Sequence, residues 1–219
     1  MLVSHYNDGM QRNEYPTLEY ESAFWQQGLM RVAGIDEAGR GAWAGPVTAA
    51  AVILPPDMNI LAVLSEVRDS KQMTAQQRGF NEQVIKRSAA AWGVGFASCV
   101  EIDAYGILAA TKIAMSRALA QLQRQAHALL IDAVSLKNHS NLPQQSIIHG
   151  DVLSLSIAAA SVLAKVARDR WMTAAENRYP GYGFARHKGY GTAQHQAAIQ
   201  QNGACEIHRF SFRPIAGTK

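Results

Sequence analysis

The chain has 219 residues, of which 48% are hydrophobic and 17% are charged, and its formal net charge at pH 7 is +4. This composition is typical of one globular domain with a sizeable core, and the apolar runs are too short to span a membrane. The two cysteines are too few for a disulfide framework or a zinc site, and residues 1–14 lack the apolar segment of a signal peptide. We therefore expect a cytoplasmic protein with reduced thiols and no membrane role.

The start of the chain differs in character from the rest. Residues 1–29 are polar and irregular except for a short helical stretch at 18–25, and we interpret them as an N-terminal extension. The main domain is then expected at residues 30–214, followed by a short tail at 215–219. No repeat, low-complexity tract or interdomain linker interrupts the main domain.

The main domain predicts strands and helices in an alternating order. The pattern of apolar, β-branched and capping residues predicts strands at 30–39, 46–54, 93–100, 128–133 and 146–149, and helices at 74–91, 104–125, 152–178 and 193–201. The first two strands are expected to pair through a glycine-rich turn, and Thr74 is the expected N-cap of the first long helix. A strand, a helix and a strand in succession favour a parallel crossover. The order predicts an α/β domain with a mixed sheet.

Aspartates close several of these strands. Asp36 and Asp132 each end a short apolar run of the kind buried in a sheet, Glu37 follows Asp36 directly, and Asp151 follows the strand at 146–149. If the strands are neighbours, their carboxylates meet, and close buried carboxylates need protons or a hard cation. Mg²⁺ or Mn²⁺ suits oxygen ligands, and a pair of such ions suits phosphodiester hydrolysis.

Each acid taken alone also fits a structural role. An aspartate at a strand end is commonly a turn former or a helix cap, and Asp151 lies where the next helix would have its N-cap. Successive strand residues point to opposite faces, so Asp36 and Glu37 face one metal pair only if the strand ends or bulges there. The glycines that follow make such a break plausible.

Glycines and basic residues suggest phosphate contacts near the acids. Gly39-Arg40-Gly41 would let backbone amides approach a nucleotide, although such a sequence is more often a plain turn. Asp69-Ser70-Lys71 precedes a helix and fits either a phosphate contact or a solvated cap. On the long helix, Ser161, Lys165 and Arg168 share one polar arc, which either grips phosphates and supports the acids or simply faces solvent.

The loop at residues 187–192 (His-Lys-Gly-Tyr-Gly-Thr) combines a base, an aromatic ring and a flexible backbone. Lys188 and Tyr190 suit the stacking of a sugar or base beside a held phosphate. His195, His208 and Arg209 fit additional phosphate contacts, although a lone histidine is more often packed or on the surface.

Taken in chain order, these motifs strongly resemble the ribonuclease HII family, the bacterial type 2 ribonuclease H. The resemblance runs from about residue 32 to residue 214. It is carried by residues 35–41, 45–47, 69–71, 131–132, 150–151, 158–169, 179–180, 188–192 and 208–209.

The resemblance implies a ribonuclease H-like mixed sheet flanked by helices, with a helical C-terminal part. It also implies Mn²⁺- or Mg²⁺-dependent cleavage of the RNA strand in RNA/DNA hybrids, and incision 5′ of single ribonucleotides in duplex DNA, as in ribonucleotide excision repair. This cleavage would leave 3′-hydroxyl and 5′-phosphate ends. No protein partner is indicated, and we expect a monomer.

The resemblance also implies roles for individual residues. The implied metal-binding and catalytic carboxylates are Asp36, Glu37, Asp132 and Asp151. The implied substrate-binding residues are Gly39, Arg40, Gly41, Lys71, Ser161, Lys165, Arg168, Lys188 and Tyr190. Among them, the Gly-Arg-Gly segment would contact the ribonucleotide 2′-hydroxyl, and Tyr190 would stack on the sugar of the following deoxynucleotide.

The chain departs from the family pattern in a few places. Ala133 stands where glycine is common, His149 stands where lysine is frequent, and Ala42-Trp43 replaces a more usual Pro-Leu-like pair. None of these changes removes an implied ligand. His149 would alter phosphate affinity or pH response.

Other functions fit the same residues less well. A non-catalytic hybrid-binding module would need a broken acid set, and a nucleotide phosphate loop would need a Gly-Lys-Ser/Thr sequence that is absent here. A type 1 ribonuclease H or a junction resolvase would share the fold and the acids. The Gly-Arg-Gly segment and residues 188–192 point instead to type 2.

Overall fold

The computed structural model describes residues 15–137 and 140–217. One mixed sheet of five strands, in the order β3-β2-β1-β4-β5, forms the centre of the described chain. The strands are β1 (Val32–Ala38), β2 (Val47–Ile53), β3 (Ala91–Ala97), β4 (Ala128–Asp132) and β5 (Gln144–Ile147). The helices are α1 (Glu19–Trp25), α2 (Ile60–Val63), α3 (Ala75–Ser88), α4 (Cys99–Tyr105), α5 (Ile107–Ala120), α6 (Gly150–Leu153), α7 (Leu155–Arg178), α8 (Phe184–His187) and α9 (Ala193–Asn202), with the 3-10 helix η1 at Ser70–Gln72.

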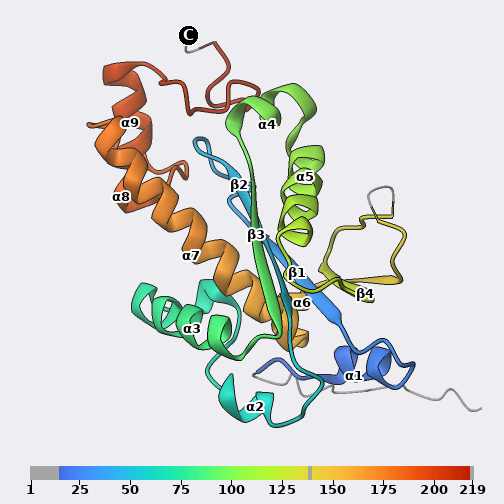
Figure 1. Cartoon of the computed structure of the whole chain (residues 1–219). Helices are drawn as coiled ribbons and strands as arrows, with labels where there is room; N and C mark the ends of the chain where they lie inside the picture. The colour runs from blue at the N-terminus through green and yellow to red at the C-terminus, as the bar shows by residue number, and fades with distance from the viewer. Residues whose placement is uncertain (1–14, 138–139, 218–219) are drawn as a thin grey trace, which may run out of the picture.

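The sheet lies between α5 on one face and α7 on the other (Figure 1). Alternate residues of β1 and β2 face each helix: Ile35 and Ala51 belong to the core under α5, whereas Ala50 and Val52 pack under α7. The α7 side is built from small residues that allow a close approach. A side chain at Gly34 would place its Cβ 2.2 Å from the backbone of Ser156, so glycine is required where β1 meets α7.

The predicted mixed α/β architecture is confirmed, and the strand directions explain how the acids meet. β2 runs antiparallel to both β1 and β3, and β4 runs parallel to β1 and to β5. β3 and β4 therefore point the same way, as the predicted crossover requires, but β2 and β1 lie between them. The carboxyl ends of β1 and β4 are neighbours, and this places their last residues side by side.

Several predicted boundaries are wrong: the strand predicted at 146–149 is β5 at Gln144–Ile147, and two further differences have clear local reasons. The strand predicted at 93–100 ends at Ala97, because Ser98 and Glu101 form a capping box that starts α4. The helix predicted at 104–125 is divided at Gly106, whose φ of 79° interrupts the helical backbone, and α5 ends at Ala120.

The other helices follow the prediction more closely. Thr74 caps α3 with a complete capping box that includes Gln77. The helix predicted at 152–178 is interrupted at Ser154, which caps α7, and the preceding turn forms the separate helix α6. None of the described helices is long and apolar enough to cross a membrane.

The described part of the predicted extension packs on the sheet. The Glu21 carboxylate is buried, and its Oε1 accepts hydrogen bonds from Ser154 Oγ (2.7 Å), Ser156 Oγ (2.6 Å) and Ser156 N–H (2.9 Å). Thr17 joins the same segment through backbone hydrogen bonds to Leu153 and Leu155. Helix α1 therefore holds the first turn of α7, while residues 1–14 of the extension lie outside the described residues.

The family departure at Ala133 has a structural consequence. Ala133 follows β4 with a φ of 49°, a conformation in which a Cβ is strained and glycine is not. The side chain is exposed, so little burial is lost when its methyl group is removed. We predict that Ala133→Gly stabilises the protein by about 0.5–1 kcal/mol, which raises the midpoint of thermal unfolding by a few degrees.

Ala174→Gly is the matched control for this prediction, because Ala174 is exposed inside α7. Glycine in a helix interior destabilises by about 1 kcal/mol, so the control should lower the midpoint. A lower midpoint for both variants would contradict the assignment of strain to Ala133.

Candidate active site

Three of the predicted acids line one cleft at the carboxyl ends of the central strands. Ile35 and Ile131 are paired across β1 and β4, so Asp36 and Asp132 follow at adjacent strand ends. Asp36, Glu37 and Asp132 line a cleft of about 680 Å³, and Asp151 reaches it through a salt bridge to Lys71, which also lines it. The complete lining is Asp36, Glu37, Ala38, Gly39, Arg40, Gly41, Ser70, Lys71, Arg78, Asp132, Ser161, Lys165 and Tyr190.

Asp36 and Glu37 reach this cleft without a β-bulge. The register of β1 with β2 is regular at both residues, since Asp36 pairs with Ala50 and Glu37 pairs with Ala49. Their side chains therefore leave opposite faces of β1, and yet both line the cleft. The cleft consequently takes in both faces of the strand end, which answers the geometric objection raised by the sequence.

Asp36 is the most strongly perturbed of the acids. Its side chain is buried, and Oδ1 accepts a hydrogen bond from the Glu37 N–H at 2.7 Å. Burial, followed by the negative charges of Glu37 and Asp132, holds the pKa of Asp36 well above its usual value. An ionised Asp36 is therefore an unfavourable group that a cation would stabilise.

Glu37 has one oxygen with a partner and one without. Oε1 accepts a hydrogen bond from Arg40 Nη1 at 3.1 Å, whereas the buried Oε2 has no hydrogen-bond partner in the described residues. Burial raises the pKa of Glu37 although Arg40 opposes this shift. A buried carboxylate oxygen without a donor is costly, and a metal ion would satisfy it.

Asp132 and Asp151 complete the acidic group from β4 and α6. Asp132 Oδ1 accepts a hydrogen bond from the Gly150 N–H at 2.8 Å, which ties the end of β4 to the start of α6. Asp151 is the second residue of α6 and not its N-cap, since His149 occupies that position. Burial raises the pKa of Asp151, and Lys71 Nζ, 3.3 Å from Oδ2, opposes the shift.

These carboxylates fit a divalent cation by chemistry. Every donor in the group is oxygen, the side chains of Asp36 and Asp151 are buried, and Glu37 Oε2 lacks a partner in the described residues. No three histidine, cysteine or carboxylate side chains among residues 15–137 and 140–217 form a ready-made set of metal ligands. The acids are instead held by Arg40, Lys71 and backbone N–H groups, which a bound cation would partly replace.

Two buried arginines hold the loop that follows the acids. Arg168 donates to the carbonyls of Pro46 (3.0 Å), Ala44 (3.1 Å) and Lys188 (3.0 Å). Arg209 donates to the carbonyls of Gly45 (3.0 Å), Arg40 (2.8 Å) and Gly39 (2.7 Å). Five of these six bonds end on residues 39–46, so the Gly-Arg-Gly segment has a fixed backbone.

This arrangement corrects the expected roles of both arginines. We expected Arg168 among the substrate-binding residues and Arg209 as a possible phosphate contact, but both guanidinium groups are buried behind the loop. A Cβ at Gly39 would lie 1.9 Å from Arg168 Nε, so the close approach of this side chain requires glycine there. The two arginines shape the cleft wall from behind and do not line it.

Lys188 and the histidines also lie away from the acids. Lys188 Nζ donates to Thr173 Oγ1 at 2.7 Å and to the carbonyl of Ala185, and Lys188 does not line the acidic cleft. His195 and His208 are fully buried, which agrees with the packed role that the sequence left open for them and not with phosphate contacts. From this part of the chain, only the Tyr190 side chain reaches the cleft.

The remaining expected substrate residues surround the acids. Gly39, Arg40, Gly41, Lys71, Ser161, Lys165 and Tyr190 all line the cleft. Ser161 Oγ lies 2.8 Å from Ser70 Oγ, and Lys165 Nζ lies 2.7 Å from Asp169 Oδ1 and 5.7 Å from the Tyr190 ring centroid. Positive charge and an aromatic ring thus border a group of carboxylates.

One cleft residue, Arg78, has no recognisable signal in the sequence. It belongs to α3, where an arginine on a helix resembles any solvated residue. In the structure it lines the cleft and donates to the carbonyls of Ser70 (2.8 Å) and Met73 (2.5 Å). Arg78 therefore fixes the η1 turn that carries Lys71.

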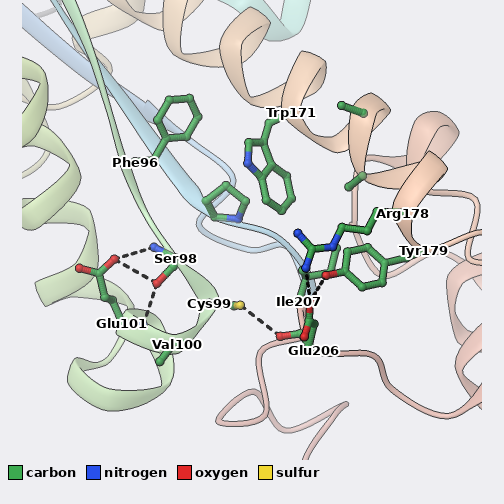
Figure 2. A pocket seen from close by; sticks show the side chains of 13 residues that line it. Phe96, Ser98, Cys99, Val100, Glu101, Trp171, Arg178, Tyr179, Glu206 and Ile207 are labelled. Atoms are coloured by element: carbon green, nitrogen blue, oxygen red, sulfur yellow. Dashed lines mark hydrogen bonds and ion pairs between the residues drawn. The ribbon is translucent and has the colours of Figure 1, made fainter.

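A second cleft differs in character from the acidic one (Figure 2). Figure 2 shows the rings of Phe96 and Trp171 in a largely apolar hollow, with Arg178 and Tyr179 beside Glu206. Its two carboxylates are already paired, Glu101 with Arg117 at 2.7 Å and Glu206 with Arg178 at 3.1 Å. The hollow therefore lacks the group of close, incompletely satisfied acids that marks the first cleft.

Comparisons with known proteins agree with this geometry. A family model described as Ribonuclease HII matches residues 33–215. The ribonuclease HII of Chloroflexus aurantiacus is 50% identical over 201 residues, which covers 91% of this chain and 94% of the relative. That of a Synechococcus strain is 48% identical over 207 residues, covering 94% and 92%.

Solved structures give the same fold. Ribonuclease H2 from Pyrococcus horikoshii matches 86% of this chain and 97% of its own with a TM-score of 0.73, at 23% identity. Bst ribonuclease HIII in complex with Mn²⁺ matches 90% of this chain and 71% of its own with a TM-score of 0.69, at 19% identity. At these identities the likeness shows the fold alone.

A ribonuclease H-like sheet and the family match together define a metal-dependent nuclease, a hydrolase of phosphodiester bonds. More specifically, the chain belongs to the ribonuclease HII family. Membership supports endoribonuclease activity on RNA/DNA hybrids and dependence on divalent metal ions.

The raised pKa of Asp36 leads to a prediction about stability. Such a group stabilises the fold while it is protonated, and this contribution is lost as the pH rises through its pKa in the folded protein. Asp36→Asn removes the charge and keeps an acceptor for the Glu37 N–H. We predict that it stabilises the metal-free protein at neutral pH by on the order of 1 kcal/mol, a gain that disappears at low pH.

Thermal unfolding in EDTA and in Mn²⁺ checks this prediction. The parent protein should be stabilised by Mn²⁺ and the variant much less, because the variant has lost a ligand. Asp57 is an exposed aspartate that does not line the cleft, so Asp57→Asn should change neither the stability in EDTA nor the stabilisation by Mn²⁺. A variant less stable than the parent in EDTA would contradict the electrostatic account.

The three hydrogen bonds from Arg209 to the loop carbonyls lead to a second prediction. Burial, followed by the charge of Arg168, lowers the pKa of Arg209 to about 9, so the guanidinium is charged at neutral pH. Lysine cannot reproduce three directed N–H donors, and carbonyls of residues 39–45 would lose buried partners. We predict that Arg209→Lys lowers the free energy of unfolding by about 2–3 kcal/mol in urea titrations.

Arg213→Lys is the control for Arg209→Lys, because Arg213 is exposed in the same C-terminal segment. It should stay within about 0.5 kcal/mol of the parent. Equal stability of the two variants would show that Arg209 does not hold the loop.

Proposed function

We propose that this protein incises duplex DNA on the 5′ side of a single embedded ribonucleotide and also cleaves the RNA strand of RNA/DNA hybrids. The products are 3′-hydroxyl and 5′-phosphate ends. The observation that carries the proposal is the meeting of Asp36, Glu37 and Asp132 with the Gly-Arg-Gly loop in one cleft, beside Asp151. Family membership supports the hybrid substrate, and the loop supports recognition of the ribose.

In this proposal the carboxylates of Asp36, Glu37, Asp132 and Asp151 hold two Mg²⁺ or Mn²⁺ ions. When bound, the ions supply an activated water and stabilise the leaving oxygen of the phosphodiester. The Mn²⁺ in the ribonuclease HIII structure supports this choice of ion for a related fold. Arg40 and Lys71, which pair with acids in the described chain, are then free to turn towards phosphates.

In this proposal, residues of the cleft wall recognise the substrate by contacts to its sugars and phosphates. The backbone of residues 39–41, held from behind by Arg209, lies open to the cleft and contacts the ribose 2′-hydroxyl, the group that distinguishes RNA from DNA. The Tyr190 ring stacks on the sugar that follows. Lys165, whose Nζ lies 5.7 Å from the centroid of this ring, neutralises a nearby phosphate.

The wider assignments belong to the same proposal. Residues 30–214 act as one ribonuclease H type 2 domain between an N-terminal extension and a short tail, and the protein works in the cytoplasm in ribonucleotide excision repair. Its partners are nucleic acids. A monomeric state and the lack of a protein partner stay predictions.

Incision of a duplex with one ribonucleotide tests the proposal directly. We predict cleavage 5′ of the ribonucleotide that requires Mg²⁺ or Mn²⁺, and loss of incision by more than about 100-fold in Asp132→Asn. The Asp132 carboxylate would lose charge, although Asn keeps an acceptor for the Gly150 N–H. Product mapping at nucleotide resolution gives the position of the cut.

Asp57→Asn supplies the control, since it makes the same chemical change on an exposed residue outside the cleft. It should retain full incision. Circular dichroism establishes that both variants are folded. Metal-dependent incision that persists in Asp132→Asn, or cleavage of an all-DNA duplex at the same rate, would overturn the proposal.

A further inference from the structure

Three histidines gather behind the loop that carries Tyr190. His187 ends α8, His195 lies in α9 and His208 lies in the C-terminal segment, and the last two side chains are fully buried. The rings of His187 and His195 stack with centroids 4.5 Å apart, and those of His195 and His208 are 5.2 Å apart. These histidines do not line the acidic cleft, so the proposed chemistry does not use them directly.

Hydrogen-bond partners assign one tautomer to each buried ring. A carbonyl oxygen only accepts, so His195 Nδ1, which lies 3.0 Å from Tyr190 O, carries a proton. Burial lowers the pKa of His195 to about 4, so the ring is neutral at pH 7 and its Nε2 is an acceptor. His208 Nε2, 3.0 Å away, must then donate to it.

The hydrogen bonds that link Tyr190 O, His195 and His208 form a relay, and this relay continues to Cys205. Because burial also lowers the pKa of His208, that ring is neutral and its Nδ1 is an acceptor. It accepts from the Cys205 N–H at 2.9 Å, and the thiol Sγ lies 3.2 Å away. The 3.1 Å approach of His208 Nδ1 to Cys205 O is then a contact without a hydrogen bond. Each donor in the relay faces one acceptor.

The groups around the relay are other imidazoles, aromatic rings and the Cys205 thiol. His195 faces His187 and His208, the ring of Trp43 and the ring of Phe184. His208 faces Cys205 and the rings of Tyr182 and Phe184. A proton added to His195 Nε2 would set two donors against each other across 3.0 Å, and a proton added to His208 Nδ1 would face the Cys205 N–H at 2.9 Å.

The relay ends on the backbone that presents Tyr190. His195 holds the Tyr190 carbonyl, and His187 Nδ1 accepts from the Gly189 N–H at 3.2 Å, so the Tyr190 residue is held on both sides. The Gly189 carbonyl also accepts from the Trp43 N–H at 2.8 Å, which connects the loop to residues 39–46. The Tyr190 residue is 36% exposed and lines the cleft, where a nucleotide can reach it.

We infer that His208 and His195 are positioning residues for substrate recognition: His208 fixes the tautomer of His195, whose Nδ1–H holds the Tyr190 carbonyl and so orients the Tyr190 ring against the substrate. The inference rests on the proposed contact of Tyr190 with the nucleic acid. It assigns a role in specificity to two residues that touch neither metal ligands nor substrate.

Kinetics of incision test the inference with a matched pair of variants. His208→Leu removes the donor to His195, whereas His208→Gln offers an amide N–H at nearly the same place. With the single-ribonucleotide duplex, KM is expected to rise about tenfold in His208→Leu with kcat within about twofold, and to return most of the way in His208→Gln.

A double-variant cycle separates positioning from a general loss of structure. In a Tyr190→Ala background, where no ring is left to orient, His208→Leu should add less than about twofold to KM. A full tenfold effect in that background, an equal loss of kcat, or equal damage by Leu and Gln would overturn the inference.

Nitrogen NMR of the imidazoles in the parent protein keeps the relay testable if a variant fails to fold or if the proposed incision is absent. The expected result is a neutral Nδ1–H tautomer for His195 and a neutral Nε2–H tautomer for His208 at pH 7. The opposite tautomers, or a charged ring, would exclude the relay independently of any activity.

Discussion

Repulsion among carboxylates is the constraint around which this structure is arranged. Parallel pairing of β1 with β4 puts Asp36 and Asp132 at adjacent strand ends, and the sequence adds Glu37 and Asp151. Burial and mutual charge raise the pKa values of three of these acids, so the metal-free protein holds them at a cost in stability. A rigid sheet packed between α5 and α7 makes this cost tolerable, because the strand ends cannot move apart.

The same constraint explains the internal cations and the loop around the acids. Arg40 and Lys71 reach into the group from exposed positions, so they compensate charge without closing the cleft. Arg168 and Arg209 are fully buried and have a different role. Their N–H groups donate to backbone carbonyls of the loop and of Lys188, and so hold the loop in place. A site that must discriminate a single hydroxyl group needs such a fixed backbone.

Much of the architecture could be predicted from local sequence. Apolar runs that end in aspartate located β1 and β4, and the helix between β3 and β4 predicted their common direction, but whether β1 and β4 are neighbours was left open by the sequence. Ser98 and Glu101 carried a readable capping signal that marked the start of α4, but the β-favouring residues before them concealed it. The acids were therefore predictable as a group, whereas several element boundaries were not.

The sequence does not show which basic side chains are buried and which line the cleft, because this depends on tertiary packing. On a helical wheel Arg168 is equivalent to Lys165, and only the packing of residues 39–46 against α7 shows that Arg168 is buried while Lys165 lines the cleft. The same holds for Lys188, whose backbone carbonyl, and not its ammonium group, serves the site by accepting from Arg168. Contacts between residues far apart in sequence leave no pattern that a single chain reveals.

A crystal structure with Mn²⁺, analysed by anomalous scattering, tests the central claim most directly. The account predicts manganese peaks bound by the oxygens of Asp36, Glu37, Asp132 and Asp151, with the strands in the positions described above. Manganese bound only elsewhere on the protein, or bound without contact to Asp36 and Asp132, would contradict it.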